Sequence, residues 1–570
     1  MKHRKFAPFF WTQFWGAFND NVYKNALLIM FAVRAASEER SGELISIAGG
    51  LFILPFVLFS GIAGQIADQF PKVQLIRITK AAEVFVMGCA VLGFLLQWEP
   101  LLLLVLFLMG LQSTFFGPVK YSILPEQFEE KELVAANAMI EMGTFLAILT
   151  GTTLGGAVAS NVNYACVAVM TVALFGLLTS FLIPNEKTPF QRLDIDFHPI
   201  RQFQSLYHAA RQNQSTYLSI IAISWFWFVG AVILSQLPTF VKFVLGGDET
   251  VMTLTMTWFT MSLALGAILS SHLSKDGIEP ALVILGAFGL TVPLIDLWVC
   301  SYPYQGTELL NITRVLQSRD SFFLARITTD ILALGICGSL YIIPLYAMLQ
   351  QRSSPGSCSR VVAANNVINS LFMVISSISV GFFYGQGLGT ASVFGLVGIL
   401  NMIFNLGLLY IMPEFLYRLL FWFKGWRGWT ADIQGGDVPR YGPVVILSEL
   451  QTNTEYSILL KSCQRSIPLV LKPSQESRLR FPGRTRTLSY KYDALALIHK
   501  SLRENEAICL LCHNLTSAEK EEMNRILRMA HRMGATVAKA HFASGATPLS
   551  PKTSQVWTCI AHTDEQNSQA

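Results

Sequence analysis

Six charged side chains form three closely spaced pairs inside long apolar runs of this sequence. The pairs are Asp20 with Lys24, Lys80 with Glu83, and Arg326 with Asp330. Residues three or four positions apart lie on one face of a helix, so the two members of each pair are able to form an ion pair. A charge inside hydrocarbon is costly unless it meets a partner or a cavity. The spacing therefore predicts polar chemistry within a membrane, although Lys80 and Glu83 fit equally well as a structural pair that snorkels near the end of a span.

Carboxylates and amides also occur singly within the apolar runs. Asp20 is flanked by Asn19 and Asn21, and Glu141 lies in another run. We expect Asp20 and Glu141 to face a pore, where a carboxylate can relay a proton or a sodium ion. The composition does not choose between these ions. The residues predicted to line a transport path are Asp20, Asn21, Lys24, Lys80, Glu83, Asn137, Glu141, Asn365, Arg326 and Asp330.

A duplicated motif indicates that the chain contains two related halves. Val134-Ala135-Ala136-Asn137 recurs as Val362-Ala363-Ala364-Asn365, and Tyr121-Ser122-Ile123-Leu124 is echoed by Tyr346-Ala347-Met348-Leu349. The first copy lies within residues 110–141, which we interpret as the turn between two membrane helices. An even number of spans separates the two copies, so both copies enter the membrane in the same direction. The halves are therefore predicted to be parallel repeats.

Composition places the chain in a lipid bilayer. Hydrophobic residues make up 52% of the sequence and charged residues only 14%, whereas soluble domains are about one quarter charged. The formal net charge of +5 is small for 570 residues and gives no case for binding nucleic acid. The nine cysteines are scattered, so their spacing predicts neither a disulfide framework nor a metal site.

About twelve runs are long and apolar enough to cross the hydrocarbon layer. They lie near residues 6–33, 43–66, 74–97, 100–118, 133–160, 163–184, 214–243, 250–272, 278–300, 321–349, 361–386 and 389–413. The first run is basic and then apolar, but it continues too far for a removable signal, so we expect a retained span. Lysine and arginine gather in the loops of one side, which predicts that both termini are cytoplasmic.

The loop after the second span resembles the signature loop of the major facilitator superfamily. It contains Gly64, Asp68 and Lys72, with Arg77 beyond. The resemblance implies that Gly64 allows two helices to approach closely and that Asp68 caps a helix or forms an ion pair at the cytoplasmic face. Its implied role is conformational, because it latches one state of the transporter without binding substrate. An ordinary aspartate in a polar turn is the alternative interpretation.

Several further blocks resemble the bacterial lysophospholipid transporter family, a branch of the major facilitators. The blocks are Phe18-Asn19-Asp20-Asn21, Gly117-Pro118-Val119-Lys120-Tyr121, Trp225-Phe226-Trp227-Phe228-Val229-Gly230 with Gln236 and Pro238, Leu273-Ser274 with Glu279, Ile343-Pro344-Leu345-Tyr346, and Ala363-Ala364-Asn365-Asn366. The resemblance covers roughly residues 1–415. It implies flipping of lysophospholipids, chiefly lysophosphatidylethanolamine, across the bacterial inner membrane for re-acylation. It also places Asp20 in the transport path and implies no cofactor.

The chain beyond residue 415 has a soluble composition and resembles the glycerophosphate acyltransferase fold. That fold uses a histidine base followed by an aspartate, and the matching positions here are Leu450 and Glu455. Leucine cannot accept a proton, so we expect a non-catalytic domain. His499 and Glu504 have the right spacing but lie outside the expected place. Cys509 to His513 matches a haem-attachment pattern, which we reject because its first part is typical of a core strand.

The sequence thus predicts an all-α membrane protein with a twelve-helix major facilitator fold, six plus six in parallel repeats, followed by a small α/β acyltransferase-like cytoplasmic domain. The predicted parts are a first half (1–184), a cytoplasmic linker (185–213), a second half (214–415), an interfacial segment (416–435) and the C-terminal domain (436–570). The predicted partners are a lysophospholipid, the bilayer, and a cytoplasmic acyltransferase or acyl carrier protein synthetase.

Three functions remain open at this point. The first is a lysophospholipid flippase, in accord with the family resemblance. The second is an ion-coupled exporter of drugs or metabolites, because the same fold serves many substrates. The third is a membrane-tethered lysophospholipid acyltransferase, which the leucine at position 450 argues against.

Overall fold

The computed structural model describes most of the membrane region and the regular elements that follow it. The described residues are 3–34, 38–159, 161–184, 198–211, 214–274, 278–301, 321–353, 357–411, 415–416, 419, 431–433, 444–448, 469–472, 486–489, 494–503, 507–512, 515–533, 535–540, 554–556 and 558–560. The chain divides into two compact units. The larger unit holds residues 1–211, 216–278 and 285–402, and the smaller holds 212–215, 279–284 and 403–570.

The first half of the membrane region consists of six long helices and two short ones. They are α1 (His3–Arg34), α2 (Glu38–Gln69), α3 (Lys72–Leu96), α4 (Glu99–Ser122), α5 (Leu124–Gln127), α6 (Glu130–Val158), α7 (Val162–Phe181) and α8 (Pro199–Ala210). The long helices fall where the apolar runs predict them. The short helix α8 lies in the stretch that we predict as a linker, where its Pro199 occupies the favourable first turn.

The second half contains six further long helices. They are α9 (Gln214–Phe243), α10 (Glu249–Leu273), α11 (Ala281–Ser301), α13 (Ser321–Arg352), α14 (Cys358–Gly385) and α15 (Thr390–Ile411). Within the described residues, eleven helices are long and apolar enough to span a membrane, and α1 is not among them. The helix α1 has the length to span, with 32 residues, but it carries the polar run Asn19-Asp20-Asn21 and Lys24 in its middle. Eleven of the twelve predicted spans therefore correspond to apolar helices, and the remaining one corresponds to α1, whose middle is polar.

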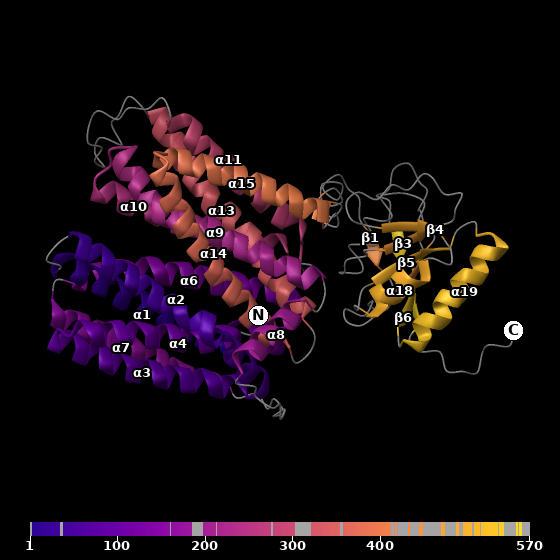
Figure 1. Cartoon of the computed structure of the whole chain (residues 1–570), viewed down its shortest axis with the longest axis horizontal. Helices are drawn as coiled ribbons and strands as arrows, with labels where there is room; N and C mark the ends of the chain where they lie inside the picture. Colours follow the sequence, from indigo (N-terminus) through magenta and orange to yellow (C-terminus); the bar gives the residue numbers. More distant parts are fainter. Residues whose placement is uncertain are drawn as a thin grey trace. The chain divides into compact units, whose positions relative to one another are not determined.

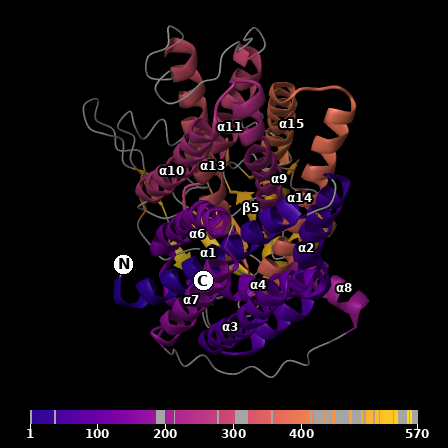
Figure 2. The same cartoon turned by 90° about the vertical axis from the view of Figure 1, so that its left-hand side faces the viewer.

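Helix packing holds each half together and also joins the two halves. In the first half α1 packs on α6 and α7, and α2 packs on α4, while in the second half α10 packs on α13. The halves meet through α2 with α14 and through α6 with α10. Figures 1 and 2 show α1–α7 grouped apart from α9–α15. In Figure 1 the two groups separate at one end and come together at the end that carries α8, which we call the loop end.

Glycines let α6 pack against the backbone of α1. A Cβ atom on Gly151 would lie 2.5 Å from the carbonyl oxygen of Phe18, and one on Gly155 would lie 2.6 Å from that of Val22. Only a residue without a side chain permits this approach, which is a common basis for helix packing in membranes. These glycines therefore serve close helix packing. It fixes the helix that carries Asp20.

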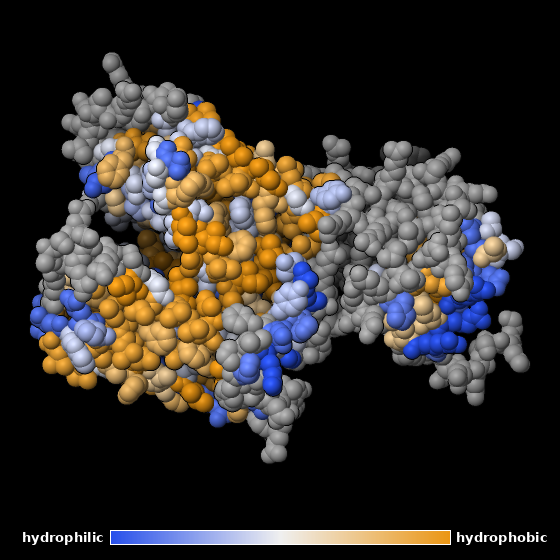
Figure 3. Space-filling view, viewed as in Figure 1, coloured by the Kyte–Doolittle hydropathy of each residue, from blue (hydrophilic) through white to orange (hydrophobic). Residues whose placement is uncertain are grey.

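The outer surface of the membrane region is apolar. Phe85, Val167 and Phe382 are among many large hydrophobic side chains that are more than half exposed. Figure 3 shows these surfaces as a broad hydrophobic band over the helices. Such a surface is favourable only in lipid, because an exposed apolar area of this extent is not found on monomeric soluble proteins. The chain is thus a multi-pass membrane protein.

The smaller unit contains a six-stranded sheet. Its strands are β2 (Val444–Ser448), β3 (Leu469–Lys472), β4 (Arg486–Ser489), β5 (Ala507–Leu511), β6 (Thr536–Ala540) and β8 (Thr558–Ile560), in the order β4-β3-β5-β2-β6-β8. All neighbours are parallel except β6 and β8. Two further strands, β1 (Ala431–Ile433) and β7 (Ser554–Val556), form a separate pair.

Two helices of this unit complete its core. They are α18 (Ala494–Arg503) and α19 (Ser517–Arg532), and their Ile498 and Ile526 pack with Ile508 of the sheet. The sequence predicts strands that end at Ser448, run over 507–511 and run over 536–540, and all three are present. It also predicts a helix over 525–533, but α19 begins earlier because Thr516 forms a capping box with Glu519. Leu450, Glu455 and Glu504 lie outside the described residues, while His499 is exposed on α18.

Candidate functional site

A cavity of about 320 Å³ lies between the two halves of the membrane region. It is lined from α1, α2, α3, α4 and α6 on one side and from α9, α13 and α14 on the other. Figure 3 shows the surface hollowed at the end opposite the loop end. Its polar lining residues include Gln13, Asp20, Asn21, Lys24, Lys80, Gln112, Ser113, Lys120, Thr144, Asn366 and Asn369. The cavity is the natural candidate for a transport site.

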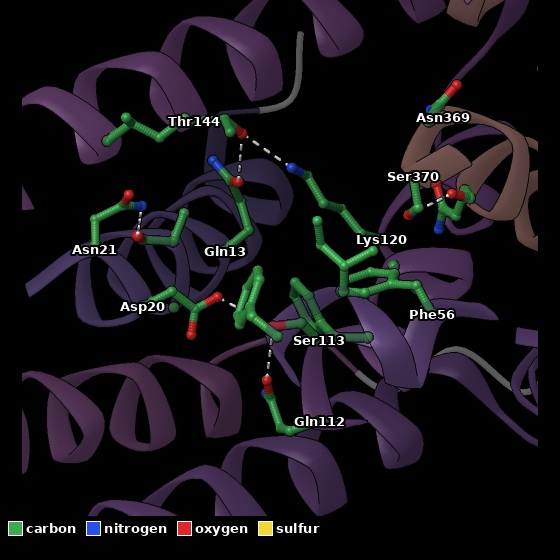
Figure 4. A pocket seen from close by; sticks show the side chains of 18 of the residues that line it. Gln13, Asp20, Asn21, Phe56, Gln112, Ser113, Lys120, Thr144, Asn369 and Ser370 are labelled. Atoms are coloured by element: carbon green, nitrogen blue, oxygen red, sulfur yellow. Dashed lines mark hydrogen bonds between the residues drawn. The ribbon is translucent and has the colours of Figure 1, made fainter. Parts of the chain in front are cut away.

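Asp20 faces this cavity from the middle of α1. The hydroxyl of Ser113, on α4, donates a hydrogen bond to Asp20 Oδ2 at 3.0 Å (Figure 4). Lys24 does not pair with Asp20, since its ammonium lies over the ring of Phe52 at 5.1 Å from the ring centroid. The two residues share a helix face, but Asp20 is directed toward α4 and Lys24 toward α2. Both remain accessible to a ligand in the cavity, and Asn21 lines it as well.

Lys80 and Glu83 form a buried ion pair directly behind α1. Lys80 Nζ lies 2.7 Å from Glu83 Oε2, and the side chains are only 1% and 3% exposed. Glu83 also accepts hydrogen bonds from Asn19 at 3.1 Å and from Gln112 at 3.3 Å. The pair forms as the spacing predicts, and its burial excludes the snorkelling alternative. Lys80 lines the cavity, whereas Glu83 is not among the lining residues.

The space for this ion pair depends on a glycine of α1. A Cβ atom on Gly16 would lie 2.2 Å from Lys80 Nζ. The ammonium of Lys80 is also 5.0 Å from the centroid of the Phe116 ring. The Glu83 carboxylate and the Phe116 ring therefore hold the Lys80 ammonium at the cavity wall, in space left by the missing side chain of Gly16.

Lys120 supplies a second cation on the same wall. Its Nζ donates to the Thr144 hydroxyl at 2.9 Å, and that hydroxyl lies 3.2 Å from Gln13 Oε1. Figure 4 shows Lys120 and Gln13 converging on Thr144. Among the described residues no carboxylate lies within ion-pair distance of Lys120 or of Lys24. Both ammonium groups are therefore available to an anion.

Two stacked tyrosines, one from each half, line the cavity. The rings of Tyr121 on α4 and Tyr346 on α13 have centroids 4.5 Å apart and planes 4° apart. The Tyr121 hydroxyl donates to Glu141 Oε1 at 2.6 Å, and Trp227 Nε1 donates to the Tyr346 hydroxyl at 3.1 Å. Glu141 thus lies behind Tyr121 and is not among the cavity-lining residues. The two tyrosines occupy equivalent places in the duplicated motif. That equivalence is the sequence feature from which their pairing could have been predicted.

An amide pair joins the halves nearer the loop end. Asn137 Nδ2 donates to Gln350 Oε1 at 2.8 Å, and Gln350 Nε2 donates back to Asn137 Oδ1 at 2.9 Å. Both residues are buried, as is Asn365 on α14. Asn137 and Asn365, which we predicted to line the path, are not among the residues lining this cavity. Asn137 lies in the closed contact between the halves.

The loop end is held shut by Asp68 at the C-terminal end of α2. The backbone N–H of Ser359 donates to Asp68 Oδ1 at 3.0 Å, and Arg360 Nε donates to Oδ2 at 2.8 Å. Asp68 therefore caps the first turn of α14 and forms an ion pair with it. A Cβ atom on Gly64 would lie 2.8 Å from that of Ala363, so α2 and α14 meet closely here.

The other two residues of the signature loop have local partners. Lys72 forms an ion pair with Glu126 of α5. Arg77 donates to the carbonyl oxygen of Ile183 at 3.0 Å, just beyond α7. These contacts fix the α2–α3 turn within the first half, whereas Asp68 alone of the four reaches the second half through a hydrogen-bonding side chain.

Arg326 and Asp330, which we predict to lie in a transport path, do not line this cavity. Arg326 does not pair with Asp330. Its Nε and Nη2 atoms donate instead to the carboxylate of Asp296 on α11, with Nε 2.7 Å from Oδ2. The sequence spacing favoured the partner four residues away, but the adjacent helix offers a carboxylate with two free oxygens. Bidentate arginine pairs are stronger than single contacts, which explains the choice.

The remaining wall of the cavity is apolar. Phe52, Phe56, Phe116, Trp227 and Met373 line it from both halves. The cavity therefore combines one carboxylate and two ammonium groups that have no ion pair among the described residues with a large apolar surface. Such a lining suits an amphipathic molecule that carries a negative charge and a positive one.

Comparisons with known proteins agree with this architecture. A family model described as Major Facilitator Superfamily matches residues 12–307. The chain is 26% identical over 368 residues to the Lysophospholipid transporter LplT of Pectobacterium carotovorum, which covers 62% of this chain and 80% of the relative. It is 27% identical to the protein of the same name from Klebsiella pneumoniae, over 65% of this chain and 87% of the relative.

A solved structure shares the fold at low sequence identity. The human organic anion transporter MFSD10 superposes with a TM-score of 0.56 at 11% identity, over 70% of this chain and 98% of that one.

Proposed function

Because the chain belongs to the Major Facilitator Superfamily and is a multi-pass membrane transporter, we propose that its substrate is a lysophospholipid of the lysophosphatidylethanolamine type. Relatives named as lysophospholipid transporters, at 26–27% identity, support the choice of substrate. We place the protein in a bacterial inner membrane with the loop end cytoplasmic. The transported lipid would then be available for re-acylation by a separate cytoplasmic acyltransferase or acyl carrier protein synthetase.

The chemistry of the cavity lining carries this proposal. A lysophosphatidylethanolamine head group has one phosphodiester anion and one ammonium. Lys24 and Lys120 are unpaired cations that can bind the phosphate oxygens, and Asp20 can accept from the ammonium. The apolar wall that includes Phe52 and Trp227 suits a single acyl chain. A fully apolar or purely anionic substrate would leave part of this lining without a partner.

Transport requires the halves to rock about the central site. The described state is closed at the loop end by the Asp68 contact with α14, by the Asn137–Gln350 amide pair and by the tyrosine stack. With that end cytoplasmic, the cavity opens outward and collects lipid from the outer side of the membrane. Opening toward the cytoplasm must break all three contacts, and the substrate must supply that free energy by binding the other state better.

Asp20 is the residue with which we test the proposal. Full-length protein in proteoliposomes is offered labelled lysophosphatidylethanolamine, and Asp20→Ala is expected to reduce uptake severalfold because the substrate ammonium loses its partner. Asp248→Ala is the matched control, since Asp248 only caps the exposed start of α10. Equal uptake by wild type and Asp20→Ala would remove Asp20 from the mechanism.

Head-group analogues separate the proposal from the alternatives. Monoacylglycerol lacks both charges, so it should compete poorly with the labelled lipid. If the wild-type protein moves no lysophospholipid and a deletion strain instead becomes sensitive to drugs, the chain is an exporter of another substrate class. Acylation of a lysolipid by the full-length protein would overturn our proposal that the C-terminal domain is non-catalytic.

A further inference from the structure

A second group of charged residues, which includes the buried Asp330, lies in the C-terminal half, outside the cavity lining. Oxygen atoms of Asp296 and Asp330 and the Sγ atom of Cys300 lie within 4.8 Å of one another, between α11 and α13. Arg326, one turn before Asp330, binds both oxygens of Asp296. Figure 1 shows α11 and α13 in the half formed by α9–α15.

The charges in this cluster do not balance. Asp296 and Arg326 neutralise each other, so a second carboxylate at Asp330 would leave one net negative charge. Asp330 is only 8% exposed, and its Oδ2 atom is buried without a hydrogen-bond partner. A buried carboxylate of this kind requires one positive charge, either a bound cation or a proton.

The surroundings favour a proton over a metal ion. A hard cation needs several oxygen ligands, about six for Mg²⁺ or Ca²⁺. Both oxygens of Asp296 already accept from Arg326, and the Cys300 thiol is directed to the carbonyl oxygen of Leu297 at 3.7 Å. Only Asp330 retains a free oxygen, which is enough for a proton and too few for a metal.

Among the described residues, the titratable groups that interact with Asp330 come from α11 and from α13 itself. The groups facing Asp330 are Asp296 and Cys300 from α11 and Arg326 from its own helix. On α10, which packs along α13, the titratable residues are Glu249 and His272, in the first and last turns.

We propose that Asp330 is a proton-exchange site that couples proton movement to transport, an inference that rests on the proposed function. When the O–H bond of Asp330 breaks, the proton passes to water along the partly exposed Asp296 and Arg326 side chains. The carboxylate left behind draws Arg326 into a shared interaction with Asp296. The same helix carries Tyr346 and Gln350, about 24 Å and about 30 Å away at 1.5 Å per residue, so a shift of α13 reaches the closed contact between the halves.

Two measurements on the full-length protein test this assignment. Infrared difference spectra of the purified protein should contain the C=O stretch of a protonated carboxylic acid that Asp330→Asn removes and Asp248→Asn retains. In proteoliposomes, a gradient of one pH unit should raise lysolipid accumulation by up to about tenfold for one proton per substrate. Asp330→Asn should lose that increase while still exchanging lipid across the membrane. Asp330→Glu keeps the carboxyl group and should keep the increase, which guards against a folding defect.

The outcomes distinguish the coupling site from the transport proposal. An Asp330→Asn protein that still responds to the gradient, or that retains the carboxylic acid band, overturns the proton site. Loss of the band on adding sodium or calcium at constant pH also overturns it, in favour of a metal cation. A wild-type protein that shows the Asp330 band but moves no lysolipid supports the proton site and refutes the proposed substrate.

Discussion

Removal of the Arg360 side chain should open the loop end of the transporter. Arg360 Nε lies 2.8 Å from Asp68 Oδ2, and the Asp68 side chain is 3% exposed while Arg360 is 31% exposed. Breaking a fully buried ion pair costs about 3–5 kcal/mol, but solvent reaches Arg360 and the Ser359 N–H still binds Asp68. We therefore expect Arg360→Ala to destabilise the closed loop end by about 2 kcal/mol, roughly a 30-fold change in the ratio of the two states.

A cysteine placed at the same contact reports this change. Ser122 is buried, and its hydroxyl lies 2.9 Å from that of Ser359 across the interface between the halves. In an Ser122→Cys background, a thiol reagent should react up to about 30-fold faster when Arg360→Ala is added, if reactivity follows the open population. Arg525→Ala is the control, because it removes an exposed ion pair between Arg525 and Glu521 in the C-terminal domain.

The change in labelling rate shows whether the Asp68–Arg360 ion pair stabilises the closed loop end or is only a surface contact. Unchanged labelling in Arg360→Ala would show that the ion pair contributes nothing to closure and would refute the reasoning. Arg360→Lys keeps the charge but loses the planar fork, so it should give an intermediate rate.

Two further predictions concern the stability of the first half. Lys80→Ala leaves Glu83 buried without its cation, so the melting temperature of the purified protein should fall by an amount corresponding to about 3–5 kcal/mol. Adding Glu83→Gln to Lys80→Ala should recover part of the loss. A lack of recovery would contradict the electrostatic explanation. Gly155→Ala places a Cβ atom 2.6 Å from the carbonyl oxygen of Val22, so it should destabilise the protein by about 1–3 kcal/mol; the same change at Gly381, where a Cβ meets nothing within 4 Å, should be neutral.

Hydrophobic length and the duplicated motif were sufficient to predict the membrane helices. Apolar runs of 20 residues or more have few structural alternatives in lipid, because backbone groups must be satisfied within the segment. The short helix α8 was missed because its sequence is amphipathic and lies within a polar stretch. The strands at 444–448 and 507–511 were found because each is a short apolar run bounded by polar residues.

Contacts between helices could not be read from spacing alone. The four-apart rule suggested Asp20 with Lys24 and Arg326 with Asp330. In the structure Asp20, Lys24 and Arg326 each contact a residue of another helix instead. Lys80 and Glu83 do pair, and α1 and α4 cover the pair with Asn19 and Gln112, which both donate to Glu83. Helix-face arguments identify which residues can meet, while packing decides which do.

The stacked rings of Tyr121 and Tyr346 have a consequence for how the chain tolerates change. In a two-fold symmetric pair, a residue near the axis meets its own copy. Here two copies joined in one polypeptide retain that arrangement, because the facing rings come from matching positions of the repeats. Enlarging one ring therefore requires a compensating reduction of its counterpart. Substitutions at these two positions should be correlated, although more than two hundred residues separate them in the sequence.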